Sequence, residues 1–99
     1  MVKTAKYEVV MIFNVNLGEE SVTALNERFQ GMMKNNGTIE SVEDWGKRRL
    51  AYPIDDELEG YYTLVRMSCG PDFPAELDRV FKITDGVLRT MIIRLEDEA

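Results

Sequence analysis

The sequence predicts an α+β fold in which a four-stranded antiparallel sheet carries two helices on one face, in the order β-α-β-β-α-β. Two segments repeat apolar residues at three- and four-residue steps, which is the spacing of a buried helix stripe. Four other segments are rich in β-branched and aromatic residues and alternate in polarity. This order is the ferredoxin-like, split β-α-β arrangement. The length of 99 residues suits one domain, so we expect residues 1–99 to form a single ferredoxin-like domain.

The first half of the chain supplies one strand and one helix. Residues 7–14 are predicted as a strand whose odd positions are apolar and face the core: Tyr7, Val9, Met11 and Phe13. Residues 19–35 are predicted as a helix with one apolar stripe that ends in two methionines, Met32 and Met33, which we interpret as core residues. We expect Asn36-Gly37 to end this helix, because glycine adopts a left-handed cap without strain.

The second half supplies three strands and the other helix. Residues 38–45, or beyond, are predicted as a strand that is interrupted at Gly46, and residues 60–68 as the next strand. Residues 74–82 are predicted as a helix, since a first turn accommodates Pro74. Asp85-Gly86 is expected to turn the chain into a last strand at residues 87–95.

Alternation within the two central strands indicates an apolar surface on the face away from the helices. That face carries Val10, Ile12, Tyr62 and Leu64, where solvent contact would be expected. Exposed apolar groups of this kind usually mark a binding surface. We therefore expect these four residues to form a face for a protein partner.

The sequence lacks the residues that catalysis and metal binding need. It has no histidine and one cysteine, Cys69, which excludes a histidine base, a cysteine zinc site and an internal disulfide. Gly46-Lys47 is similar to the end of a phosphate-binding loop, but Ser41 and Arg48 replace residues that such a loop requires. The acidic run at residues 55–59 lacks the glycine and spacing of a calcium loop and is interpreted as a solvated turn. We expect no catalysis, no metal, no cofactor and no small-molecule substrate.

The N-terminal apolar run at residues 9–13 is too short to cross a bilayer, so we expect no membrane contact and a cytoplasmic location.

Three adjacent positive charges, Lys47-Arg48-Arg49, stand out because the chain is acidic, with 18 acidic and 12 basic residues. Arginine suits phosphate, and Tyr52 nearby offers a ring on which a base can stack. Strand alternation directs these charges to both faces. We therefore predict a nucleic-acid contact, although a solvated hairpin arm remains the alternative. The residues expected to contact RNA are Lys3, Lys6, Lys47, Arg48, Arg49, Tyr52 and Arg89.

Residues 45–54, WGKRRLAYPI, resemble the signature of the bacterial family of small-subunit ribosomal protein six. Shorter matches support the resemblance over nearly the whole chain, at Tyr7-Glu8, at Gly60-Tyr61-Tyr62, and at Asp85, Val87 and Arg89. The resemblance implies a ferredoxin-like fold without enzymatic activity. It also implies binding to the central domain of 16S rRNA together with small-subunit protein eighteen as heterodimer partner.

Two features depart from the family pattern. Residues 55–57 are acidic where family members often carry lysine, and the sequence ends at Ala99 without the long tail of many members. A protein-interaction or ligand-binding module on the same fold remains open as an alternative function. A hydrolase of the acylphosphatase type is disfavoured, because residues 15–18 supply no arginine for a phosphate.

Overall fold

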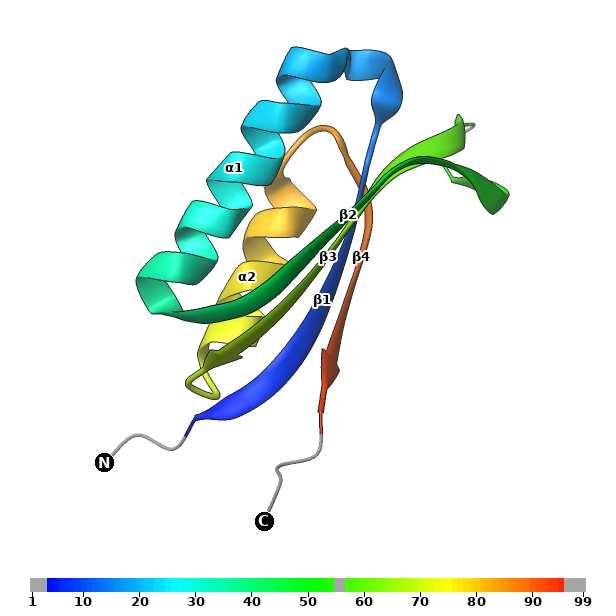
Figure 1. The fold of residues 1–99 in the computed structure, drawn as a ribbon. Helices are drawn as coiled ribbons and strands as arrows, with labels where there is room; N and C mark the ends of the chain where they lie inside the picture. The colour runs from blue at the N-terminus through cyan, green and yellow to red at the C-terminus, as the bar shows by residue number, and fades with distance from the viewer. Residues whose placement is uncertain (1–3, 55–56, 96–99) are drawn as a thin grey trace.

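The computed structural model describes residues 4–54 and 57–95, and it confirms the predicted order of strands and helices (Figure 1). The elements are β1 (Ala5–Phe13), a 3₁₀ turn η1 (Val15–Leu17), α1 (Glu19–Asn36), β2 (Gly37–Ile54), β3 (Glu57–Cys69), α2 (Phe73–Ile83) and β4 (Val87–Arg94). The strands lie in the order β2-β3-β1-β4, and all three pairings between them are antiparallel. Both helices pack on one face (Figure 1), and we call the opposite side of the sheet the open face.

The hydrophobic core lies between the helices and the sheet. The odd positions of β1 are buried as predicted: Tyr7, Val9, Met11 and Phe13. The ring of Phe29 on α1 has its centroid 6.3 Å from that of Phe13 and 4.5 Å from that of Phe81 on α2. Burying a large apolar side chain contributes roughly 1.5–3 kcal/mol. This aromatic cluster therefore fastens both helices to the sheet.

One polar contact crosses the core. The Asn26 side-chain amide of α1 donates to the Thr63 hydroxyl of β3 at 2.9 Å, and Gln30 donates to the Asn26 carbonyl at 2.8 Å. Both Asn26 and Thr63 are buried, so an unpaired group at either position would be costly. The contact favours one register of α1 against the sheet.

Gly37 has a role that differs from the predicted one. Its φ of −176° is extended, so it is not a left-handed cap. A Cβ atom at this position would lie 2.2 Å from the backbone oxygen of Ser68. Gly37 is therefore required because β2 starts in close contact with β3. The Asn36 amide caps the helix instead by donating to the Met32 carbonyl at 2.8 Å.

The second strand is longer than predicted. β2 continues through Gly46, which has a φ of +75°, and the interruption takes the form of a register shift between Asp44 and Gly46. β3 likewise starts at Glu57 rather than at residue 60. We call residues 46–54 and 57–60 the arm. Figure 1 shows it extending from the body of the sheet, away from both helices.

Candidate nucleic-acid interface

Leu50, the first apolar residue after Lys47-Arg48-Arg49, anchors the arm against the open face. Leu50 is only 8% exposed. A Cβ atom placed on Gly60 would lie 2.4 Å from the Ile12 Cγ2 atom and 3.3 Å from the Leu50 Cδ2 atom. Leu50 and Ile12 therefore lie together over Gly60, and the glycine is needed for this close approach. Alternation along β2 turns Arg49 away from this contact, to the same side as Lys47, and keeps Arg48 on the face of Leu50.

The Arg48 guanidinium lies over Trp45, one ring of an aromatic pair at the base of the arm. The Trp45 and Tyr62 rings stack with centroids 6.2 Å apart, and the Arg48 guanidinium lies 6.0 Å from the Trp45 centroid. Within the described residues, neither Arg48 nor Arg49 forms an ion pair. A cation on a ring face keeps N–H donors available for phosphate oxygens.

The structure brings Tyr52 and Arg89 together, although their strands lie at opposite edges of the sheet. Arg89 of β4 donates from Nη1 to the Tyr52 hydroxyl. Its guanidinium also lies 5.9 Å from the centroid of the Tyr52 ring. Two of the residues predicted to contact RNA are therefore partners of one another.

Lys47 points to the helix side of the arm. Its Nζ atom lies 3.7 Å from a carboxylate oxygen of Glu59. With Tyr61 and residues of η1 and α1, including Glu19, it lines a hollow of about 450 Å³. A hydrogen bond to the Asp44 carboxylate, with a smaller effect of burial, raises the pKa of Tyr61 to about 12. Carboxylates thus surround the Lys47 side of the arm, and Arg48 is presented on the other.

Of the two lysines predicted near the N-terminus, the structure describes Lys6, which is not part of this group. Lys3 lies outside the described residues. Lys6 pairs with Glu40 at 3.9 Å, and it lies six positions before Ile12 on β1, which corresponds to roughly 20 Å along a strand. Lys6 is therefore at the far end of the open face from the arm.

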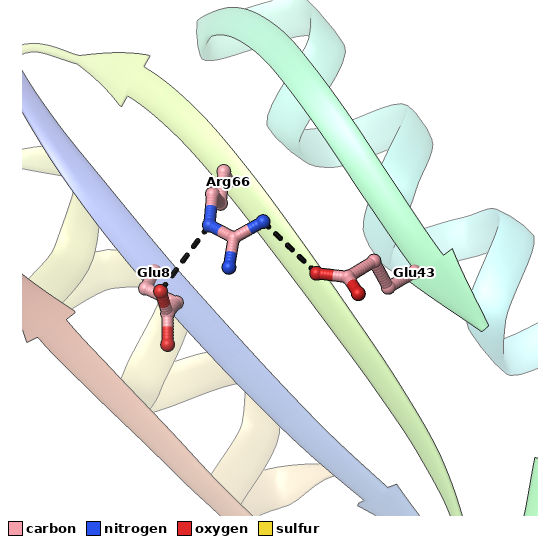
Figure 2. A network of polar contacts seen from close by, with 3 residues as sticks. All are labelled: Glu8, Glu43 and Arg66. Atoms are coloured by element: carbon pink, nitrogen blue, oxygen red, sulfur yellow. Dashed lines mark hydrogen bonds and ion pairs between the residues drawn. The ribbon is translucent and has the colours of Figure 1, made fainter. Parts of the chain in front are cut away.

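A charged network that the sequence did not reveal occupies the open face (Figure 2). Arg66 of β3 lies between β1 and β2, with Nε 3.3 Å from Glu8 and Nη1 2.9 Å from Glu43. At the same end of the face, the Ser68 hydroxyl donates to Glu40 at 3.0 Å. The signal was present in the alternation of β1 and β3, but identifying the partners required the strand register.

The predicted apolar partner face needs a correction. Ile12 and Leu64 are buried, at 7% and 4% exposure, while Val10 and Tyr62 are partly buried. Both buried residues lie on the central strands, where neighbours on either side cover them, and both Ile12 and Leu50 of the arm lie close to Gly60. The exposed apolar side chains of the open face are instead Trp45, Met91 and Ile93, each 43% exposed.

The register supports this revised surface. Met91 lies opposite Val10, and Ile93 lies opposite Glu8. Alternation in the last predicted strand already placed Met91 and Ile93 on one face with Arg89, which is the signal that could have found them.

The described residues contain no cluster of three or more metal-ligating side chains. Among the described helices, none combines the length and apolar character needed to span a membrane.

The fold and this site define a ferredoxin-like protein that presents a cationic arm and a partly apolar sheet face. The family model for Ribosomal protein S6 matches residues 6–94. The chain is 50% identical over 92 residues to small ribosomal subunit protein bS6 of Clostridium perfringens (strain SM101 / Type A), covering 92% of this chain and 97% of that relative. It is 54% identical over 91 residues to the protein of the same name from Alkaliphilus oremlandii (strain OhILAs), with 92% and 97% covered.

A solved structure agrees with these relatives. The crystal structure of 30S ribosomal protein S6 from Thermotoga maritima superposes with a TM-score of 0.88 at 30% identity, covering 94% of this chain and 89% of that one. The chain belongs to the ribosomal protein S6 family. It is therefore a structural protein of the small ribosomal subunit, not an enzyme, and its location is the ribosome in the cytoplasm.

Proposed function

We propose that this protein binds the central domain of 16S rRNA together with small-subunit protein eighteen, with which it forms a heterodimer. The observation that carries the RNA contact is the pairing of the cations. Lys6 and Arg66 on the sheet are matched by carboxylates, whereas Arg48 and Arg49 on the arm form no ion pair within the described residues. These two arginines are the groups best prepared to meet phosphates.

The electrostatics favour a local contact of this kind. Charges act over about 8–10 Å at physiological salt, so the net charge of −6 does not determine what happens at the arm. Each phosphate that a cation neutralises releases counterions. Arg48 and Arg49, with Lys47 contributing less because Glu59 already pairs with it, would supply this attraction.

The partner contact is assigned to the open face. Trp45, Met91 and Ile93 expose apolar surface there, and Val10 and Tyr62 extend it. The acidic chain favours a basic partner, because opposite charges speed the encounter and help set the register. This surface supports a protein partner whether or not RNA is present, so it also supports the alternative of an interaction module without an RNA role.

The experiment that tests RNA binding is a salt titration. The Arg48→Ala/Arg49→Ala protein is compared with the parent for binding to a central-domain 16S rRNA fragment in the presence of the partner protein. Each lost phosphate contact should flatten the slope of log K against log salt by about 0.7–0.9. The matched control is Arg79→Ala/Lys82→Ala, which removes the same charge from exposed, paired positions on α2.

An arm variant whose slope equals that of the parent contradicts the assignment of the RNA contact. If the α2 control flattens the slope of log K against log salt equally, net charge rather than the arm is responsible for the salt dependence. Copurification from cells with and without nuclease separates the two functions, because an interaction module without an RNA role keeps its partner after nuclease treatment.

A further inference from the structure

The arm needs an anchor that the sheet ladder alone does not provide. It lies outside the part of the sheet that the helices cover (Figure 1). An isolated two-stranded hairpin is at best marginally stable in water. Yet Arg48 and Arg49 can meet phosphates together only if the arm holds one position. The question is which contact, besides the burial of Leu50, fixes that position.

The geometry points to Arg89 and Tyr52. We propose that their contact is a clasp that holds the arm over the open face, and that Arg89 is a positioning residue for RNA binding rather than a phosphate ligand. This inference rests on the proposed RNA function of the arm. It gives Arg89 a positioning role in place of the RNA contact that the sequence alone predicts.

The strand register shows why the contact requires a specific arm position. Arg89 of β4 lies opposite Ile12 of β1, Ile12 lies opposite Tyr62 of β3, and Tyr62 lies opposite Gly46 of β2. A residue of β2 therefore reaches Arg89 only if the strand crosses back over β3 and β1. Tyr52, six positions after Gly46, makes this crossing. Leu50 precedes Tyr52 on this path, and its side chain lies close to Gly60, as that of Ile12 does.

The ladder of the arm is interrupted where Tyr52 leaves it. Arg49 lies opposite Glu59, but the next pair is Ile54 with Glu57, so four residues of β2 lie between these pairs and only one of β3. Pro53, which follows Tyr52, has no backbone N–H to donate to a ladder. This irregularity frees the segment around Tyr52 to bend towards β4.

The two contacts of Arg89 are specific for a guanidinium and a tyrosine. One Nη1–H group donates to the Tyr52 hydroxyl, and the planar group lies over the ring. A lysine would keep the charge and lose the planar stacking geometry. Tyr52 is 56% exposed, so the contact is open to solvent and of modest strength.

Losing the clasp should lower the fraction of protein whose arm is in the binding position, and apparent affinity falls in proportion to that fraction. We expect Arg89→Ala to weaken RNA binding about five- to tenfold, the size expected from one exposed cation–π contact and one hydrogen bond. Because Arg89 contacts no phosphate in this account, the salt slope should equal that of the parent.

The first measurement is hydrogen exchange on the free protein, which is independent of RNA. In Arg89→Ala and Tyr52→Ala, the arm amides of Arg49 and Glu59 should exchange faster, while those of Val9 and Val65 in the body should not change. Arg89→Lys should behave as an intermediate. Arm exchange that is unchanged in both alanine variants overturns the clasp.

The second measurement is RNA binding by the two single variants and their combination. If Arg89 acts through Tyr52, adding Arg89→Ala to the Tyr52→Ala protein should produce no further loss. An additive loss, with a slope flatter by about 0.7–0.9, means that Arg89 binds a phosphate and overturns the proposal. If the arm does not bind RNA at all, the Arg48→Ala/Arg49→Ala protein also binds RNA as the parent does. This result distinguishes a failure of the proposed function from a failure of the clasp.

Discussion

Leu64→Asp and Ile93→Asp look alike from the sequence alone, but the first should mainly lower stability and the second should mainly weaken partner binding. Leu64 and Ile93 both lie on the open face, and Asp at either position adds one negative charge. Leu64 is 4% exposed, so Leu64→Asp loses burial worth roughly 1.5–3 kcal/mol and also places a carboxyl among apolar groups. We expect a total loss of about 3–5 kcal/mol, against a stability of about 5–15 kcal/mol for a domain of this size. Ile93→Asp should cost about 1 kcal/mol, the range of strand propensity, because that side chain is 43% exposed.

Partner binding, unlike stability, should be sensitive to the change at the exposed position, Ile93. Ile93→Asp should weaken the heterodimer by about 2–5 kcal/mol if the open face is the interface, because the carboxylate would be buried without a partner. The matched control is Ile83→Asp, which makes the same change at an exposed position on α2. Urea unfolding measures stability, and calorimetric titration with small-subunit protein eighteen measures affinity.

Burial should also raise the pKa of the new carboxyl at position 64 in the folded state. The folded protein then binds the proton more tightly than the unfolded chain, so the destabilisation should grow as pH rises from 4 to 7. Equal stability of the Leu64→Asp and Ile93→Asp proteins would refute the assignment of burial. Parent-like affinity of a folded Ile93→Asp protein would refute the assignment of the interface.

Four further predictions concern single positions. Gly86→Ala should lower the free energy of unfolding by about 2 kcal/mol in thermal denaturation, because φ is +93° and the new Cβ would lie 2.4 Å from a leucine methyl carbon. Gly31→Ala, with nothing within 4 Å on a helix, should raise it by about 0.5–1 kcal/mol. Tyr61 should remain protonated in an ultraviolet titration until about pH 12, and Asp44→Asn should return its pKa towards 10; the stability from this hydrogen bond is present below pH 10 and lost as pH rises through 12. Cys69 is buried with a raised pKa, so a thiol reagent should label it only on unfolding; fast labelling of the native protein would contradict that.

The fold could be predicted because its signals are local. Helix stripes and strand alternation depend on residues a few positions apart, and they located every strand and both helices. The reason for Gly37 could not be found this way. Its restriction comes from the Ser68 backbone oxygen, far along the chain, which no local pattern encodes. The extra length of β2 was missed because glycine at residue 46 indicates a break, whereas the strand absorbs it as a register shift.

The site was less predictable because it depends on register and on the path of the arm. The sequence identified Arg48 and Tyr52 as candidates, but it could not place Arg89 against Tyr52. It placed Ile12 on the correct face and gave the wrong exposure, because Ile12 lies on a central strand close to Gly60 and the buried Leu50 of the arm.

Under the proposed function, the distribution of charge would explain how an acidic chain offers RNA one surface and not another. On the open face, Glu8 and Glu43 share the single positive charge of Arg66, so this network keeps one net negative charge. The first turn of α1 carries Glu19 and Glu20 on the opposite layer. RNA approaching the helices would therefore meet carboxylates, and like charges in contact are strongly disfavoured. Orientation on the RNA would then follow from repulsion at the helical layer as much as from attraction at the arm, which is how specific surfaces commonly reject the wrong approach.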